Sequence, residues 1–139
     1  MIDEIIDFIW GRYIYFHHRF TKEQVKNLLE NYSNQIIVVR DNDEIKGVSF
    51  YLKLTDETFE GIKNKILDIT NIDMINKSLQ EKGNNIHFIL LVADRVKTII
   101  RGLREIIKKE NPKSISWFSP NMKNLFIRKI REVELCHHY

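Results

Sequence analysis

The sequence has few of the residues that mark secreted, fibrous or disordered chains. Its 139 residues include one cysteine, Cys136, two prolines and five glycines. A single cysteine excludes an internal disulfide and favours a reducing compartment. Scarce proline and glycine argue against a disordered chain. The longest apolar run, Phe88 to Ala93, is far shorter than the about 20 residues that span a bilayer, and the acidic start MIDEIIDF is unlike a signal peptide. We therefore expect a soluble, cytoplasmic protein without a membrane-spanning helix.

Complete catalytic and metal-binding motifs are also missing from the sequence. It contains no glycine-rich phosphate loop, no Ser-His-Asp spacing signature and no zinc pattern. Its histidine pairs, residues 17–18 and 137–138, are adjacent and lack the i, i+4 spacing of a helical metal site, so we predict no metal. His87 is the one candidate base, because it opens the most apolar segment; a hydrogen-bonded core histidine is the alternative.

Charge is distributed unevenly along the chain. Residues 1–94 carry 11 Lys and Arg against 15 Asp and Glu, whereas residues 95–139 carry 11 against 4. The last third therefore has a net charge of +7, although the whole chain has only +3. Such an asymmetry favours a partner that carries phosphates, and the alternative is a solvated basic face.

Hydrophobic periodicity predicts alternating helices and strands in one domain, residues 1–139. Hydrophobic residues make up 43% of the chain, enough for a core. Thr21 to Gln24 has the form of a capping box, and Gly83 is expected to end a helix. The predicted helices span residues 2–18, 22–32, 56–82 in two pieces, 95–110 and 120–130, and the predicted strands span residues 35–40, 45–54, 86–93, 114–118 and 133–135. This order predicts an α/β (α+β) fold in which helices flank a mixed, mainly antiparallel sheet.

The helix predicted at residues 95–110 combines two stripes. Apolar residues at helical spacing form an expected core face: Val96, Ile99, Ile100, Leu103, Ile106 and Ile107. Lys97, Arg101, Arg104 and Lys108 form a basic stripe beside it. The helix follows the central strand directly, where free amides and the helix dipole favour an anion. Arg95, Lys97 and Thr98 would add donors to a pyrophosphate there.

The strand, helix, strand and helix predicted in residues 86–129, with the hairpin before them, resemble the acyl-CoA-binding half of the GNAT superfamily of N-acetyltransferases. Segment 95–100, RVKTII, sits where that superfamily has its Gln/Arg-x-x-Gly-x-Gly/Ala turn; it keeps the arginine and replaces both glycines, by Thr98 and Ile100. Segment 121–129 resembles the superfamily's asparagine-containing helix, with Phe126 and Arg128 where a tyrosine acid often stands. Residues 56–82 are a helical insertion relative to that pattern.

The resemblance implies a divergent enzyme that binds acetyl-CoA or another acyl-CoA and transfers the acyl group to an amine. Backbone amides near Leu91, Val92 and Ala93 would hold the thioester. Arg95, Lys97 and Thr98 would hold the pyrophosphate, and Asn121 or Asn124 would contact the pantetheine arm. Loss of catalysis in a degenerate fold is a second expectation.

Two further functions remain open from the sequence. The basic residues Lys97, Arg101, Arg104 and Lys108 would serve a nucleic-acid-binding module, whose affinity would fall steeply with salt. The first helix and the residues at its end contain more aromatic side chains than one buried helix face can accommodate. A surface for homodimer formation or for a partner is therefore the other possibility. These aromatic residues are Trp10, Tyr13, Tyr15, Phe16 and Phe20.

Overall fold

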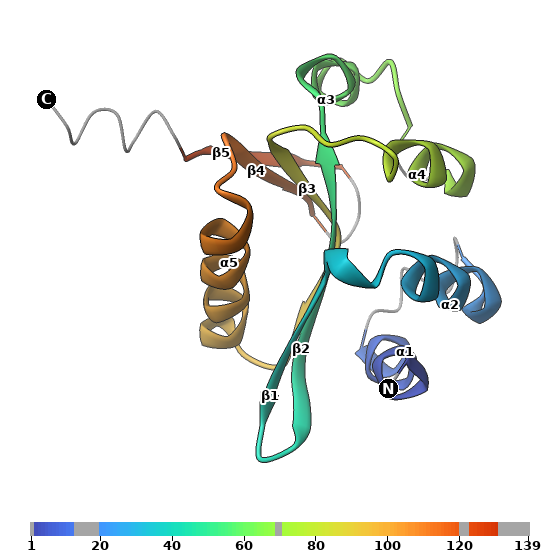
Figure 1. Ribbon diagram of the computed structural model, residues 1–139, viewed down its shortest axis with the longest axis vertical. Helices are drawn as coiled ribbons and strands as arrows, with labels where there is room; N and C mark the ends of the chain where they lie inside the picture. The colour runs from blue at the N-terminus through green and yellow to red at the C-terminus, as the bar shows by residue number, and fades with distance from the viewer. Residues whose placement is uncertain (1, 13–19, 69–70, 120–122, 131–139) are drawn as a thin grey trace, which may run out of the picture. The chain divides into compact units, whose positions relative to one another are not determined.

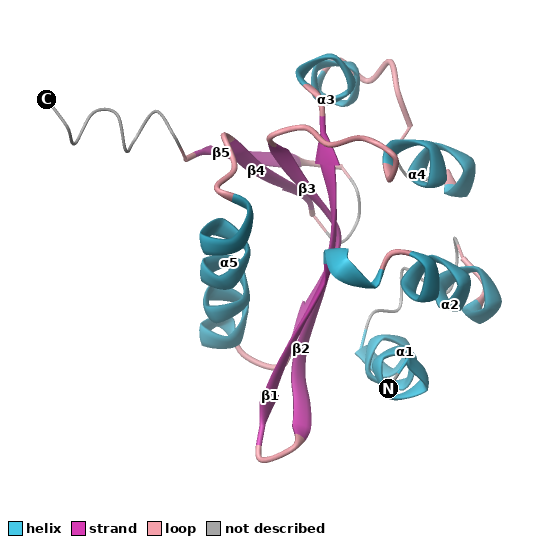
Figure 2. Ribbon diagram, in the orientation of Figure 1, coloured by secondary structure: helices cyan, strands magenta, loops and turns pink. Residues whose placement is uncertain are grey.

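A computed structural model describes residues 2–12, 20–68, 71–119 and 123–130 (Figures 1 and 2). Five α-helices, a short 3-10 helix and five strands follow one another as α1 (Ile2–Arg12), α2 (Lys22–Asn31), η2 (Ser33–Gln35), β1 (Ile36–Asp41), β2 (Glu44–Leu54), α3 (Asp56–Lys63), α4 (Ile72–Ser78), β3 (Asn85–Ala93), α5 (Val96–Glu110), β4 (Ser114–Phe118) and β5 (Leu125–Lys129). The strands form a mixed sheet in the order β1-β2-β3-β4-β5, which confirms the predicted fold class and the central place of β3.

The chain divides into two compact units. Unit 1 comprises Met1–Phe50 and Leu90–Ile106, and unit 2 comprises Tyr51–Ile89 and Ile107–Tyr139. Strands β2 and β3 and helix α5 each continue from one unit into the other.

Unit 1 contains the β1–β2 hairpin with a helix on either side (Figure 1). Asn42 and Asp43 form the two-residue turn with φ of 52° and 67°, the left-handed values that a primed hairpin turn requires. Helices α1 and α2 pack together, and α2 begins at the predicted capping box, in which the Thr21 hydroxyl and the Gln24 side chain each accept from the other residue's amide. Helix α5 lies on the other side of the hairpin.

Helix α5 buries only one narrow face, and two of its three buried residues are small. Its buried positions are Thr98, Gly102 and Ile106. A Cβ added at Gly102 would lie 3.7 Å from the Ser49 hydroxyl and from a Val39 methyl, which are ordinary van der Waals contacts and place Gly102 against the hairpin. The predicted core face is therefore wrong in part, because Val96 and Ile100 are 72% and 44% exposed.

Unit 2 contains the parallel pair β3–β4, in register from Asn85 and Ser114 onward, and the antiparallel pair β4–β5. Asn85 is buried and joins three elements: it accepts from the Ser114 hydroxyl at 2.8 Å and donates to the Leu54 carbonyl and to Asp56 at the start of α3. Lys113 also binds Asp56, at 3.0 Å.

Two sequence predictions in unit 2 are wrong. Residues 125–129 form strand β5 rather than the end of a helix, because they pair with β4 along its whole length. Gly83 does not end α4, whose C-cap is Leu79. A Cβ at Gly83 would lie 1.9 Å from the Leu54 carbonyl oxygen, so this glycine allows a loop to pass against β2. The strand predicted at residues 133–135 lies outside the described residues.

Candidate functional site

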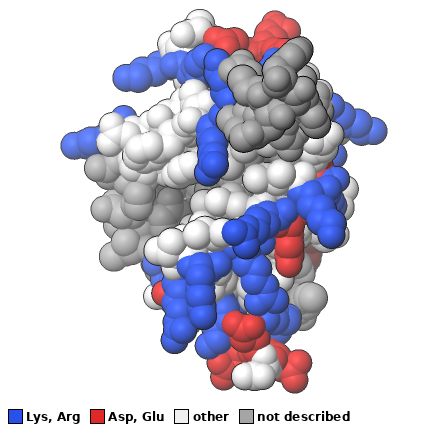
Figure 3. All heavy atoms as spheres, turned by 90° about the vertical axis from the view of Figure 1, so that its left-hand side faces the viewer, with Lys and Arg blue, Asp and Glu red and all other residues white. Residues whose placement is uncertain are grey.

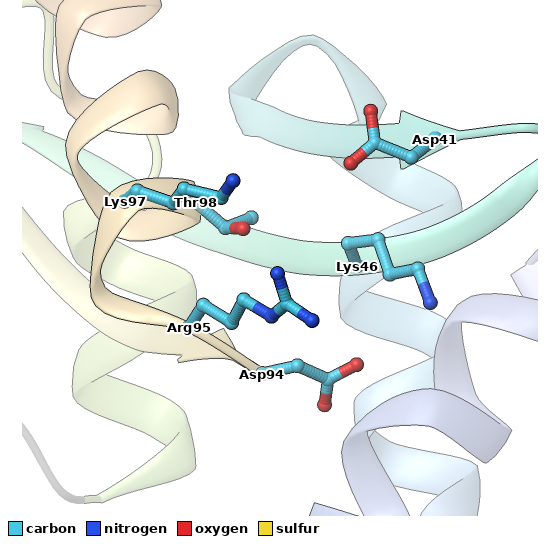
Figure 4. A pocket seen from close by; sticks show the side chains of 6 residues that line it. All are labelled: Asp41, Lys46, Asp94, Arg95, Lys97 and Thr98. Atoms are coloured by element: carbon cyan, nitrogen blue, oxygen red, sulfur yellow. The ribbon is translucent and has the colours of Figure 1, made fainter.

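A pocket of about 240 Å³ opens in unit 1 where β3 meets α5 (Figure 4). Residues from the end of β1, from β2 and from the β3–α5 junction line it: Asp41, Lys46, Asp94, Arg95, Lys97 and Thr98. In Figure 4, Arg95 reaches from the junction toward the strand that carries Lys46. Three of these six residues were predicted from the sequence to bind a pyrophosphate: Arg95, Lys97 and Thr98.

A bulge in the hairpin brings Lys46 to this pocket. Val39 pairs with Gly47 and Arg40 pairs with Ile45, so Lys46 is the extra residue of β2. Its carbonyl accepts from the Asp94 amide at 3.1 Å, which ties the bulge to the end of β3. Its ammonium lies 3.0 Å from Glu44. The sequence analysis missed Lys46, because nothing in the local pattern marks an irregularity in strand register.

Among the described residues, no side chain accepts a hydrogen bond from the first amides of α5. The Arg95 carbonyl accepts from the amides of Thr98 and Ile99, so Arg95 is the N-cap residue, and arginine has no acceptor with which to satisfy helix amides. The side chains that precede α2, α3 and α4, by contrast, accept from helix amides in the usual way: Thr21, Thr55 and Asn71. The first amides of α5 therefore keep the partial positive charge that favours a bound anion.

Both acids of the pocket already have basic partners. Arg12 binds Asp94 at 2.6 Å, and this hydrogen bond holds the pKa of the Asp94 carboxyl below its ordinary value. Arg101 binds Asp41 at 3.1 Å. Neither Arg95 nor Lys97 forms an ion pair in the part of the chain that the structure describes. Two cations beside an uncapped helix end are thus available to a phosphate.

Thr98 occupies the position of the first missing glycine and faces the hairpin. It is only 8% exposed, and a Cβ added at Gly47 would lie 2.9 Å from its γ-methyl. Ile100, at the second missing glycine, points to solvent at 44% exposure.

The other predicted site residues lie in several places. Leu91, Val92 and Ala93 end β3 immediately before the pocket. Asn124 belongs to unit 2, where its amide donates to the Ser119 hydroxyl and its carbonyl accepts from the Ser119 amide, and it does not line the pocket. Asn121 lies outside the described residues.

His87 is a buried residue of unit 2. It is 1% exposed, its Nδ1 lies 2.8 Å from the Ser116 hydroxyl, and its ring meets Phe118 edge-on at 5.5 Å. Its Nε2 is buried without a hydrogen-bond partner among the described residues. Burial lowers the pKa of His87 to about 4, so the ring is neutral near pH 7. His87 does not line the pocket.

Neither a membrane-spanning helix nor a metal-ligand cluster is found in the described parts of the chain. No helix among residues 2–12, 20–68, 71–119 and 123–130 is long and apolar enough to cross a membrane. The same residues contain no group of three or more metal-ligating side chains.

Comparisons with known proteins identify the fold. No protein-family model matches the sequence, and no curated protein does. The loading GNATL domain of CurA from Lyngbya majuscula superposes with a TM-score of 0.58 at 9% identity, over 85% of this chain and 59% of that chain. The GphF GNAT-like decarboxylase in complex with isobutyryl-CoA gives a TM-score of 0.58 at 10% identity, over 84% and 60%. The chain thus spans about three fifths of the length of these two structures. It has a divergent GNAT-like fold.

Proposed function

We propose that the chain binds an acyl-CoA, with the pyrophosphate at the start of α5. The observation that carries this proposal is the uncapped N-terminus of α5, flanked by Arg95 and Lys97 without ion-pair partners among the described residues. Helix ends of this kind bind phosphates through their amides and nearby basic side chains. The GNAT-like fold and the isobutyryl-CoA in the GphF complex support the choice of ligand.

The binding mode depends on side chains more than on a glycine-rich turn. With Thr98 and Ile100 in place of glycines, Arg95, Lys97 and Lys46 would supply the charge that neutralises the phosphates. Charge-assisted contacts between exposed groups weaken as salt rises. We expect the affinity for CoA to fall markedly between low salt and 0.5 M salt.

The bound thioester would donate its acyl group to an amine. The amine nitrogen would attack the thioester carbonyl, so that a C–N bond forms, the C–S bond breaks, and the amine proton passes to the departing CoA thiolate. The alternative is a degenerate domain that binds acyl-CoA without transfer. Release of free CoA thiol in the presence of a panel of amines separates these two functions.

Calorimetric titration of acetyl-CoA and CoA tests the proposal. We expect micromolar binding that Lys97→Glu weakens by about 10- to 100-fold, because a hydrogen bond to a charged group contributes about 1.5–3 kcal/mol. Lys77→Glu, on the exposed side of α4, is the matched control and should bind as the unchanged protein does. Equal binding of pantetheine, which lacks the pyrophosphate, or no effect of Lys97→Glu would refute the assignment.

A further inference from the structure

The solvent side of α5 carries an apolar stripe and a basic stripe, and the residues of the two stripes have the same spacing along the helix. The apolar stripe consists of Val96, Ile100, Leu103 and Ile107, and the basic stripe of Lys97, Arg101, Arg104 and Lys108. Each basic residue directly follows an apolar one, and both stripes have the spacing i, i+4, i+7, i+11. All four basic residues are exposed, as are Val96 and Ile100, while the other two apolar residues are half-buried. Lys and Arg side chains gather on this side of the molecule in Figure 3.

Neither stripe is the face with which α5 packs on the hairpin. That face consists of Thr98, Gly102 and Ile106. At 100° per residue the buried, apolar and basic stripes are separated by roughly 100–130°, so the helix has three distinct sides. The apolar side is the one that a partner would normally cover, and here two of its members are 72% and 44% exposed.

We propose that this double stripe is a docking surface for an acidic amphipathic helix of a partner protein. A helix that presents aliphatic residues at i, i+4 and i+7, with Asp or Glu beside them, matches the surface in both apolarity and charge. Arg104 does not line the pocket and forms no ion pair within the described part of the chain, so its charge is available to such a partner.

The local chemistry favours a protein over a polyanion. The two stripes contain no aromatic side chain on which a base could stack, whereas aliphatic residues alternate with the cations. One cation of the basic stripe is already partnered, because Arg101 binds Asp41 at 3.1 Å.

A synthetic amphipathic peptide tests the docking surface directly. The probe is a helical peptide of about five turns with Leu at i, i+4, i+7 and i+11 and Glu beside each Leu. We expect micromolar binding by fluorescence anisotropy, weakened about tenfold or more by Arg104→Glu and by Ile100→Ser but not by Lys77→Glu. A peptide with Lys in place of only the Glu that faces position 104 should bind the Arg104→Glu protein more tightly than the all-Glu peptide does.

Several outcomes would overturn the proposal. These are no binding of the acidic peptide, equal binding to the Arg104→Glu protein, or tighter binding to single-stranded DNA or phosphatidylserine vesicles than to the peptide. A dimer in sedimentation that Ile100→Ser dissociates would assign the surface to a second copy instead. Arg104 and Ile100 do not line the pocket, so titration of acetyl-CoA with the same variants shows whether they remain folded and separates this test from the proposed function.

Discussion

Replacement of Gly47 by alanine tests how closely the hairpin and the start of α5 must approach. The new Cβ would lie 2.9 Å from the Thr98 γ-methyl, 3.3 Å from the Ala93 Cβ and 3.5 Å from the Val92 carbonyl oxygen. The first of these distances is shorter than a real Cβ contact, so Thr98 or the strand must move.

The expected cost follows from two opposing terms. Overpacking a tight contact costs about 1–3 kcal/mol. Removing a glycine from a strand returns about 0.5–1 kcal/mol, because the unfolded chain loses conformational freedom. We therefore expect Gly47→Ala to lower the free energy of unfolding by about 1–2 kcal/mol.

A second substitution makes the prediction specific to this contact. Thr98→Ser removes the γ-methyl, keeps the hydroxyl and costs about 1 kcal/mol of lost burial. In the double variant the methyl added at position 47 takes the space of the methyl removed at position 98. The two effects should therefore not add, and the double variant should be more stable than their sum by about 1 kcal/mol.

Urea denaturation followed by circular dichroism measures the four free energies of unfolding. Gly11→Ala in α1 is the control, since no atom lies within 4 Å of the added Cβ, and it should not destabilise the protein. Strict additivity of Gly47→Ala and Thr98→Ser, or a Gly47→Ala protein as stable as the unchanged one, would refute the close approach.

Three further predictions concern unit 2 and α2. Gly83→Ala should destabilise by about 3 kcal/mol or more in thermal and urea unfolding, because its Cβ meets the Leu54 backbone at 1.9 Å and backbone yields little. As pH falls from about 6.5 to 4, the unfolded chain protonates His87 before the folded one, whose pKa burial lowers to about 4; stability should therefore fall by up to about 3 kcal/mol in this window. His87→Asn should flatten that slope in denaturation curves collected across the range, and an unchanged slope would contradict the burial argument. Thr21→Ala should lower the free energy of unfolding by about 1 kcal/mol, because it removes the capping box. An unchanged free energy of unfolding would show that the first turn of α2 is frayed and that the capping box does not stabilise it.

The local elements were largely predictable because their signals are local. The capping box at Thr21, the break between the predicted strands at residues 41–44, and the end of α5 at Glu110 each depend on side chains within a few residues of the backbone that they direct. The run from Ile86 to Ala93 similarly indicated a strand buried at the centre of the sheet, and β3 is the third of five strands.

The candidate site was predictable in part. The sequence predicted that a helix begins directly after the central strand. It therefore also predicted that Arg95, Lys97 and Thr98 lie together at the start of that helix. Lys46 could not be predicted, because it reaches the pocket through a bulge in strand pairing and a hydrogen bond to Asp94 across 48 positions of sequence. Arg12 and Arg101, which pair with Asp94 and Asp41, are 82 and 60 positions away from these partners in the sequence.

The sequence by itself determined the positions of the two hairpin strands, of β3 and of α5, because hydrophobic periodicity is a property of neighbouring residues. It also determined that the last third of the chain is basic. Tertiary structure alone decided three other features. Residues 125–129 became a strand because β4 offers them a hydrogen-bonding edge. His87 became neutral because the fold buries it. Helix α5 buries Thr98, Gly102 and Ile106 and leaves Val96 and Ile100 exposed, and its first turn fits against the hairpin because position 47 has no side chain next to Thr98.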